Sequence, residues 1–185
     1  MKVIEQEIHS LKNSISEMWA LVHQQLYNAG EAMLTGDKEL AYKVISRERR
    51  VNAFELKIDS DCEDIIALYA PVAIDLRFVL AMYKINTNLE RLGDFAESIA
   101  RFAGNLPEGE PIDPQLVKET RVEEMLSELL SMISLTKEAF EKESSEIASR
   151  IFLKDNLIDE INHNSTAIIA KYIEEHKGSA LAGLY

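Results

Sequence analysis

The chain has 185 residues and a formal net charge of −12, with 46% hydrophobic residues, 28% charged residues and only seven glycines and four prolines. This composition is typical of a helical protein with a proper core, and it excludes the disordered and fibrous classes. The acidic excess argues against nucleic-acid binding and against docking on an anionic bilayer, and the single cysteine, Cys62, excludes an internal disulfide and a cysteine-based zinc site.

The expected secondary structure is helical throughout, because apolar residues recur at helical spacing and no segment alternates as a strand would. The N-terminus has no apolar secretory segment, and the longest apolar run, residues 65–74, is too short to cross a bilayer. We therefore expect a cytoplasmic protein without membrane insertion. Helices are predicted over about residues 4–34, 38–69, 72–103, 114–140 and 145–176.

Capping residues and one proline set the predicted helix ends. Asp37 is predicted to cap the second helix, and Pro71 separates the second helix from the third. Gly104 is predicted to end the third helix as a C-terminal cap. Ser144 or Ser145 is predicted to cap the last helix.

The long helices carry apolar stripes at alternating spacings of four and three residues, which pack helices side by side in bundles. These stripes comprise Val44, Val51, Phe54, Ile58 and Ile65 on the second helix; Phe78, Met82, Ile85, Leu89, Leu92, Ala96 and Ile99 on the third; and Ile151, Ile158, Ile161, Ile168 and Tyr172 on the last. We expect these residues to form the core.

The second and last helices resemble each other when the sequence is shifted by 107 residues. The shift places Glu48 on Asp155 and Asn52 on Asp159, with apolar residues matching around them. We interpret this match as an internal duplication of a three-helix unit.

The predicted fold is therefore all-α, with two tandem three-helix bundles. The first unit covers residues 1–104, a proline-containing linker covers 105–114, and the second unit covers 115–185. The second unit lacks most of its last helix, because only a short segment, residues 179–185, follows the fifth predicted helix.

The most informative stretch runs from Asn88 to Arg101 in the third helix. It places Glu90, Asp94 and Glu97 at i, i+4 and i+7 on one helical face. Gly93 lies between them, and a glycine inside a helix costs about 1 kcal/mol relative to alanine. We therefore expect a neighbouring helix to approach closely at this glycine.

Because the chain turns near Pro71, facing residues of the second and third helices should have numbers that sum to about 141. Glu48, Asn52 and Glu55 should then face the acidic residues of the third helix, just beyond the edge of the apolar stripe. Facing carboxylates repel unless a shared cation or salt bridges to arginine (Arg47, Arg50 and Arg91) compensate them. All-oxygen ligands suit magnesium, calcium, manganese or iron.

The run Glu-Arg-Leu-Gly-Asp at residues 90–94, followed by Ala-Glu-Ser-Ile-Ala, resembles the signature helix of the bacterial phosphate-uptake regulator (PhoU) family. The resemblance implies two similar three-helix bundles in tandem, with paired Glu/Asp-x-x-x-Asp motifs that bind iron or zinc clusters. Glu90 and Asp94 match one motif, and Glu48 and Asn52 match its partner with asparagine in place of aspartate.

The resemblance extends to two further groups of residues. Asp155 and Asp159 match the motif in the second unit, but the helix that should carry their partner motif lies beyond Tyr185. Asp75 and Arg77 match a family turn motif, in which we expect Asp75 to cap the third helix. Arg77 is expected to pair with Asp75 or with the end of the second helix.

The resemblance implies a protein that is not an enzyme but a negative regulator of phosphate uptake. Such a protein would contact the phosphate ABC transporter and the phosphate-sensing histidine kinase, and would hold iron, zinc or another divalent cation at its carboxylates. An exposed apolar face on the incomplete second unit also predicts a homodimer or larger homo-oligomer.

Two alternatives stay open at this level. One is a metal-dependent or metal-storing helical bundle, for which Glu160-Ile-Asn-His163 supplies one of the two Glu-x-x-His motifs required. The other is a purely structural bundle with an acidic surface and no ligand.

Overall fold

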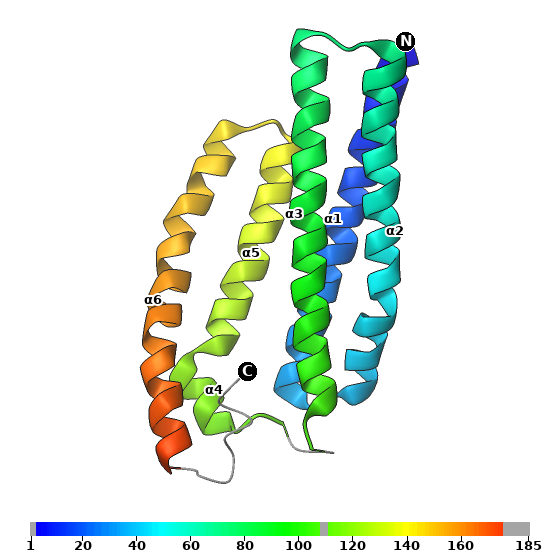
Figure 1. Ribbon diagram of the computed structural model, residues 1–185. Coiled ribbons are helices and arrows are strands. Elements are labelled where there is room, and N and C mark those ends of the chain that lie inside the picture. Colours follow the sequence, from blue (N-terminus) through cyan, green and yellow to red (C-terminus); the bar gives the residue numbers. More distant parts are fainter. Residues whose placement is uncertain (1–2, 108–110, 176–185) are drawn as a thin grey trace.

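A computed structural model describes residues 3–107 and 111–175, and every regular element within these ranges is a helix. The helices are α1 (Val3–Thr35), α2 (Lys38–Tyr69), α3 (Ala73–Asn105), α4 (Pro114–Thr120), α5 (Val122–Glu141) and α6 (Ser145–Glu175), as Figure 1 shows. The all-α prediction is therefore confirmed. The predicted segment 179–185 lies outside the described residues. No helix of the described ranges is long and apolar enough to span a membrane.

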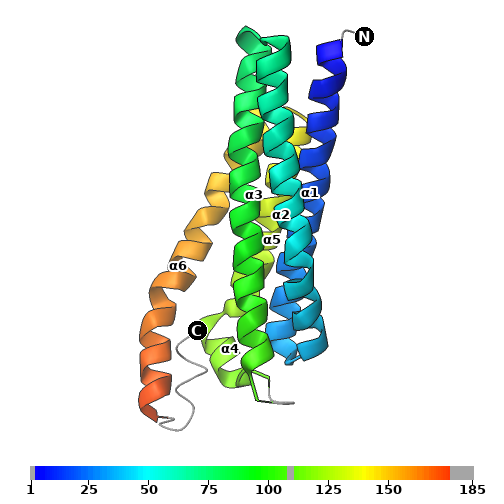
Figure 2. The same ribbon diagram turned by 45° about the vertical axis from the view of Figure 1, so that its right-hand side comes forward.

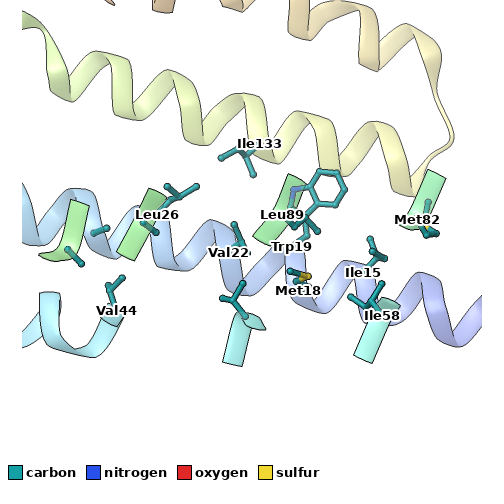
Figure 3. Close-up of a cluster of buried hydrophobic side chains, with 14 of the residues drawn as sticks. Ile15, Met18, Trp19, Val22, Leu26, Val44, Ile58, Met82, Leu89 and Ile133 are labelled. Atoms are coloured by element: carbon teal, nitrogen blue, oxygen red, sulfur yellow. The ribbon is translucent and has the colours of Figure 1, made fainter. Parts of the chain in front are cut away.

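The three long helices α1, α2 and α3 pack side by side around a buried apolar core (Figure 1). Figure 3 shows this core along α1, where Ile15, Met18 and Val22 meet side chains of α2 and α3. The fully buried aliphatic side chains of α1 recur at helical spacing, which explains why this sequence forms one long helix with one apolar face.

The buried face of α3 differs in part from the predicted apolar stripe. Met82, Leu89 and Ala96 are buried as predicted, but Phe78, Ile85, Leu92 and Ile99 are half-buried and pack against the side of the core. Their place at the centre is taken by Val79, Asn86, Gly93 and Ala100. The predicted stripe included apolar residues only, whereas Asn86 and Gly93 also belong to the buried face.

The residues that cap the N-termini of α2 and α6 are the predicted ones. The backbone N–H of Leu40 donates to the carboxylate of Asp37 at 2.9 Å, so Asp37 caps α2. The N–H of Ile147 donates to Ser144 Oγ at 3.2 Å, which makes Ser144 the cap of α6.

Three predictions at the ends of α3, for Asp75, Arg77 and Gly104, are corrected by the structure. Its N-cap is Val72, without a side-chain capping bond, so Asp75 lies inside the first turn and does not cap the helix. No ion pair joins Arg77 to Asp75 or to the end of α2 in the described part of the chain. At the other end α3 continues through Gly104 to Asn105, because Pro107 forces only Leu106 into an extended conformation.

The predicted helix over residues 114–140 is two helices. Arg121 adopts a left-handed conformation with φ of 56° and separates α4 from α5. Its guanidinium holds this kink by bonding to Glu124 at 2.7 Å and to Glu160 of α6 at 2.9 Å. No proline or glycine marks the position, so the sequence pattern did not predict it.

Helix α5 packs on α1 and thereby connects the first three helices with α4 and α6 (Figure 2). Ile133 of α5 belongs to the buried core, and Trp19 of α1 stacks on Phe140 with ring centroids 5.8 Å apart. Helix α6 packs on α5 and α4, with Ile161 and Tyr172 buried as the stripe predicted. The division into two independent units stays a prediction.

Candidate functional site

The candidate site begins at Gly93, where α2 and α3 approach each other closely. A Cβ atom added to Gly93 would lie 2.8 Å from Val51 Cγ1 and 3.5 Å from Glu48 Oε2. Because real side chains do not approach so closely, only glycine allows the two helices to meet at this height. The predicted reason for this glycine is therefore confirmed, and so is the predicted register of the two helices.

Glu48 lies inside the helix interface and not beyond its edge, which corrects the predicted position. Its side chain is only 5% exposed, and neither carboxylate oxygen has a hydrogen-bond partner within the described residues. Burial raises the pKa of Glu48 to about 7, and the nearby charges of Asp94, Glu97 and Glu90 add to this rise. A buried, unpaired carboxylate is costly, so Glu48 needs a proton or a cation.

The acidic residues around Glu48 influence one another. Burial, Asp94 and Glu55 raise the pKa of Glu90, and a hydrogen bond to Asp94 contributes, while Arg91 lowers it. Two carboxyl groups hydrogen-bond only when one of them is protonated. Burial raises the pKa of Glu55 as well, with smaller effects of Asp59 and Asp94.

We call Glu48, Glu55, Glu90, Asp94 and Glu97 the acidic cluster. Asn52 lies exposed on the same helix as Glu48 and Glu55, at the border of the cluster. At the opposite border, Glu97 accepts a bond from Arg101 Nη2 at 2.6 Å. None of Arg47, Arg50 and Arg91 forms an ion pair with the cluster in the described part of the chain. The expected salt-bridge compensation therefore reaches only the edge of the cluster.

One buried residue next to the cluster, Asn86, was not predicted from the sequence. Asn86 is fully buried, and its Nδ2 donates to the carbonyl oxygen of Glu55 at 2.9 Å and to Asp59 Oδ1 at 2.8 Å. These bonds fix the register between α2 and α3 one turn above the acidic cluster. Asn86 follows Met82 by four residues, and that spacing was the signal that could have placed it at the interface.

The donor set of the acidic cluster consists of carboxylates, which suit hard divalent cations and iron. The buried, unpaired oxygens of Glu48 are the structural feature that fits such an ion. In their present rotamers, however, no three carboxylate, histidine or cysteine side chains of the described residues converge as ligands of one metal ion. Binding would need the long glutamate side chains to change rotamer.

The predicted residues of the second unit are placed apart from this cluster. Asp155 and Asp159 are both exposed on α6, the helix that packs on α4 and α5, whereas the acidic cluster belongs to α2 and α3. Glu160 and His163 are exposed as well, and the carboxylate of Glu160 is bound to Arg121. This arrangement does not support the inward-facing ligands that a di-iron bundle requires.

Comparisons with known proteins agree with the geometry. A family model described as "PhoU domain" matches residues 15–103, which include the whole acidic cluster. A PhoU homolog of Aquifex aeolicus, named phosphate-specific transport system accessory protein, is 33% identical over 171 residues, covering 91% of this chain and 75% of the relative. The accessory protein PhoU of Escherichia coli is 34% identical over 154 residues, covering 83% of this chain and 62% of its own.

Two solved structures share the fold. The phosphate transport system regulatory protein PhoU from Streptococcus pneumoniae has a TM-score of 0.85 and 28% identity, covering 98% of this chain and 83% of its own. PhoU from Pseudomonas aeruginosa has the same TM-score and 25% identity, covering 97% of this chain and 86% of its own. The superposition therefore includes α4, α5 and α6 as well as the helices that the family model matches.

Proposed function

The chain belongs to the PhoU family of phosphate transport accessory proteins, and from this membership we propose that it regulates phosphate uptake and the phosphate-starvation response. It acts in the cytoplasm as a negative regulator, by protein contact with the phosphate ABC transporter and its sensor histidine kinase. The observation that carries this proposal is the match over nine tenths of the chain to a relative named for the phosphate transport system.

Protein contact, and not catalysis, is the mechanism that the described residues favour. Burial raises the pKa of the Cys62 thiol to about 12, so this cysteine is not a nucleophile at neutral pH. The carboxyl groups with raised pKa values, Glu48, Glu55 and Glu90, lie at the interface between the helices α2 and α3. A regulatory surface needs neither a reactive nucleophile nor a substrate-binding cleft.

Deletion of the gene in its host tests the regulatory role. We expect a strain without this chain to take up more phosphate in phosphate-rich medium and to express its phosphate-starvation genes there. Expression of the chain from a plasmid should restore both to the parental level. Unchanged uptake and unchanged expression after deletion would reject the proposed function.

The acidic cluster is the proposed cation site. Glu48, Glu90 and Asp94 would supply the ligands, with Glu97, Glu55 and Asn52 beside them, and iron, zinc or another divalent cation would neutralise the buried carboxylate. The support for this proposal is the unpaired Glu48 side chain facing three further acids. The cation would thereby hold α2 and α3 together at Gly93.

Elemental analysis after incubation with iron, zinc and manganese tests this site. We expect a stoichiometric amount of metal in the wild-type chain and none in an E90A/D94A variant. The matched control is E63A/D64A, which removes two exposed acids from another part of α2. Equal metal content in all three proteins would place the metal elsewhere, and no metal in the wild type would reject the site.

Self-association through the second unit is also proposed. Phe152 and Leu153 of α6 are 76% and 75% exposed, which is unusual for large apolar side chains in a monomer. Light scattering at micromolar concentrations should give the mass of a dimer for the wild type and of a monomer for an F152S/L153S variant. A monomeric wild type would reject the proposal.

A further inference from the structure

A groove between α1 and α3 begins where α5 ends. Helix α5 packs along α1 with Ile133 and Phe140, and then the chain turns away at Lys142 towards α6. Figure 1 shows that the α5–α6 turn lies well below the α2–α3 turn, so the upper parts of α1 and α3 extend past it. The surface that α5 covers lower down therefore continues upward, and no further helix of residues 3–107 and 111–175 covers it.

The groove is apolar and has a volume of about 610 Å³. Its lining includes the apolar side chains of Ile8, Ile74, Phe78, Met82 and Ile85, with Phe140 of α5 at its lower end. The lining residues of α3 span Ile74 to Ile85, which is roughly 17 Å of helix. The groove thus has the length and character of a seat for a short helix, continuing the line along which α5 packs.

The charges around the groove indicate what kind of helix fits. Its lining includes three carboxylates, Glu5, Asp75 and Glu143, together with one lysine, Lys12, and His9. Lys12 is already paired with Glu143 at 3.0 Å and lies over the ring of Phe140. Asp75 forms no ion pair within the described residues, so the groove is negative at its open end, and the whole chain carries a charge of −12. A second copy of this acidic chain is a poor match, whereas a basic segment is attracted.

We propose that this groove, which we call the α1–α3 groove, binds an amphipathic helix of a partner protein, with an apolar face and flanking lysine or arginine residues. The proposal deepens the proposed function and rests on it, since it assigns the contact through which the chain acts on the phosphate transport system. The partner's apolar side chains cover Ile74 and Phe78, and a basic side chain at its flank faces Asp75.

The side chains at the open end of the groove offer a matched pair of substitutions. Ile74 lines the groove and is 79% exposed, whereas Leu68 lies at the same hairpin tip, is 72% exposed and does not line the groove. Ile74→Glu and Leu68→Glu thus introduce the same charge at equally exposed sites. Because neither side chain is buried in the free protein, neither variant is expected to unfold it, and thermal unfolding checks this.

The protein contains its own reporter for the test. Trp19 is the only tryptophan, and it stacks on Phe140 at the lower end of the groove. The probe is a synthetic amphipathic peptide of about 14 residues, or nearly four helical turns, with leucines on one face and lysines on the other. Because the peptide has no tryptophan, its binding is followed through the emission of Trp19. A second peptide carries glutamate in place of lysine.

We expect a saturable change in emission with the lysine peptide, weakened at least about tenfold by Ile74→Glu and by less than about twofold by Leu68→Glu, since only the first change buries an unpaired charge. The glutamate peptide should bind at least about tenfold more weakly, because the acidic edges repel it. Absence of saturable binding, equal binding by both variants or equal binding of both peptides would overturn the proposal. Dimers of the free protein that disappear only with Ile74→Glu would identify a second copy as the occupant and would also overturn it.

Phosphate uptake by cells separates this proposal from the proposed function. If deletion of the gene leaves uptake unchanged, the regulatory function is rejected, while the peptide titration still decides whether the groove binds a helix. If the wild-type chain restores low uptake, we expect Leu68→Glu to restore it and Ile74→Glu to fail. Full restoration by Ile74→Glu would show that the groove is not the regulatory contact.

Discussion

Glu48→Gln should stabilise the metal-free protein above neutral pH, against the usual expectation that a change at a buried position destabilises. Glutamine has almost the shape of glutamate but no charge, so the substitution removes the buried carboxylate without opening a cavity. Its amide group can donate to the acids of α3, which add to the effect of burial in raising the pKa of Glu48. The gain should therefore depend on pH.

The magnitude follows from the raised pKa. In the unfolded chain Glu48 titrates near 4.5, and in the folded chain near pH 7. Between these values the folded state holds more protons than the unfolded state, so the stability of the wild type falls as pH rises through this window and levels off above about pH 7. The full shift corresponds to about 3 kcal/mol, and solvent at the exposed side of Asp94 reduces this to about 2 kcal/mol.

Urea denaturation followed by Trp19 fluorescence at pH 5, 6, 7 and 8, with a chelator present, measures the effect. We expect the variant to be more stable than the wild type by less than about 1 kcal/mol near pH 5 and by about 2 kcal/mol at pH 8. Glu63→Gln, at an exposed position of the same helix, is the control for the loss of one negative charge. A stability difference that does not change with pH would refute the reasoning.

Three further predictions concern the packing of the helices. Gly93→Ala should lower the free energy of unfolding, measured by urea denaturation, by about 1 to 3 kcal/mol, because the added Cβ meets α2. Gly104→Ala has its nearest neighbour at 3.9 Å and should raise the free energy of unfolding by about 0.5 to 1 kcal/mol. Equal effects of the two substitutions would contradict the close approach at Gly93. Phe140→Ala should lower stability by about 2 kcal/mol and shift the emission of Trp19 to longer wavelength, because the stacked ring is lost; an unchanged spectrum would contradict the stacking. Arg121→Val should lower the thermal midpoint more than Arg121→Gly does, because both variants lose the bonds to Glu124 and Glu160 but only the β-branched valine does not tolerate the left-handed backbone. Equal midpoints of the two variants would contradict the kink.

Much of the fold could be predicted because strong local signals coincide with it. Pro71 fixes the turn between α2 and α3, and the register that follows from it places Gly93 opposite Glu48 and Cys62 opposite Val79, whose carbonyl oxygen lies 3.9 Å from the thiol. Asp37 and Pro71 act within a few residues of their own position. The kink at Arg121 could not be predicted, because its left-handed backbone is held by Glu160, far along the chain.

The burial and the raised pKa of Glu48 could not be predicted either, because they also depend on residues far away in the sequence. The apolar pattern placed Glu48 outside the buried stripe, because a glutamate between Val44 and Val51 reads as a polar position. Its burial depends on Gly93, which lets α3 close over it, and its raised pKa depends on charges of α3 that lie more than forty residues away in the sequence. Spacing identified which carboxylates face each other, but only the contact between the helices shows that one of them is enclosed. That enclosure distinguishes a site that must bind a proton or a cation from an acidic surface that water can solvate.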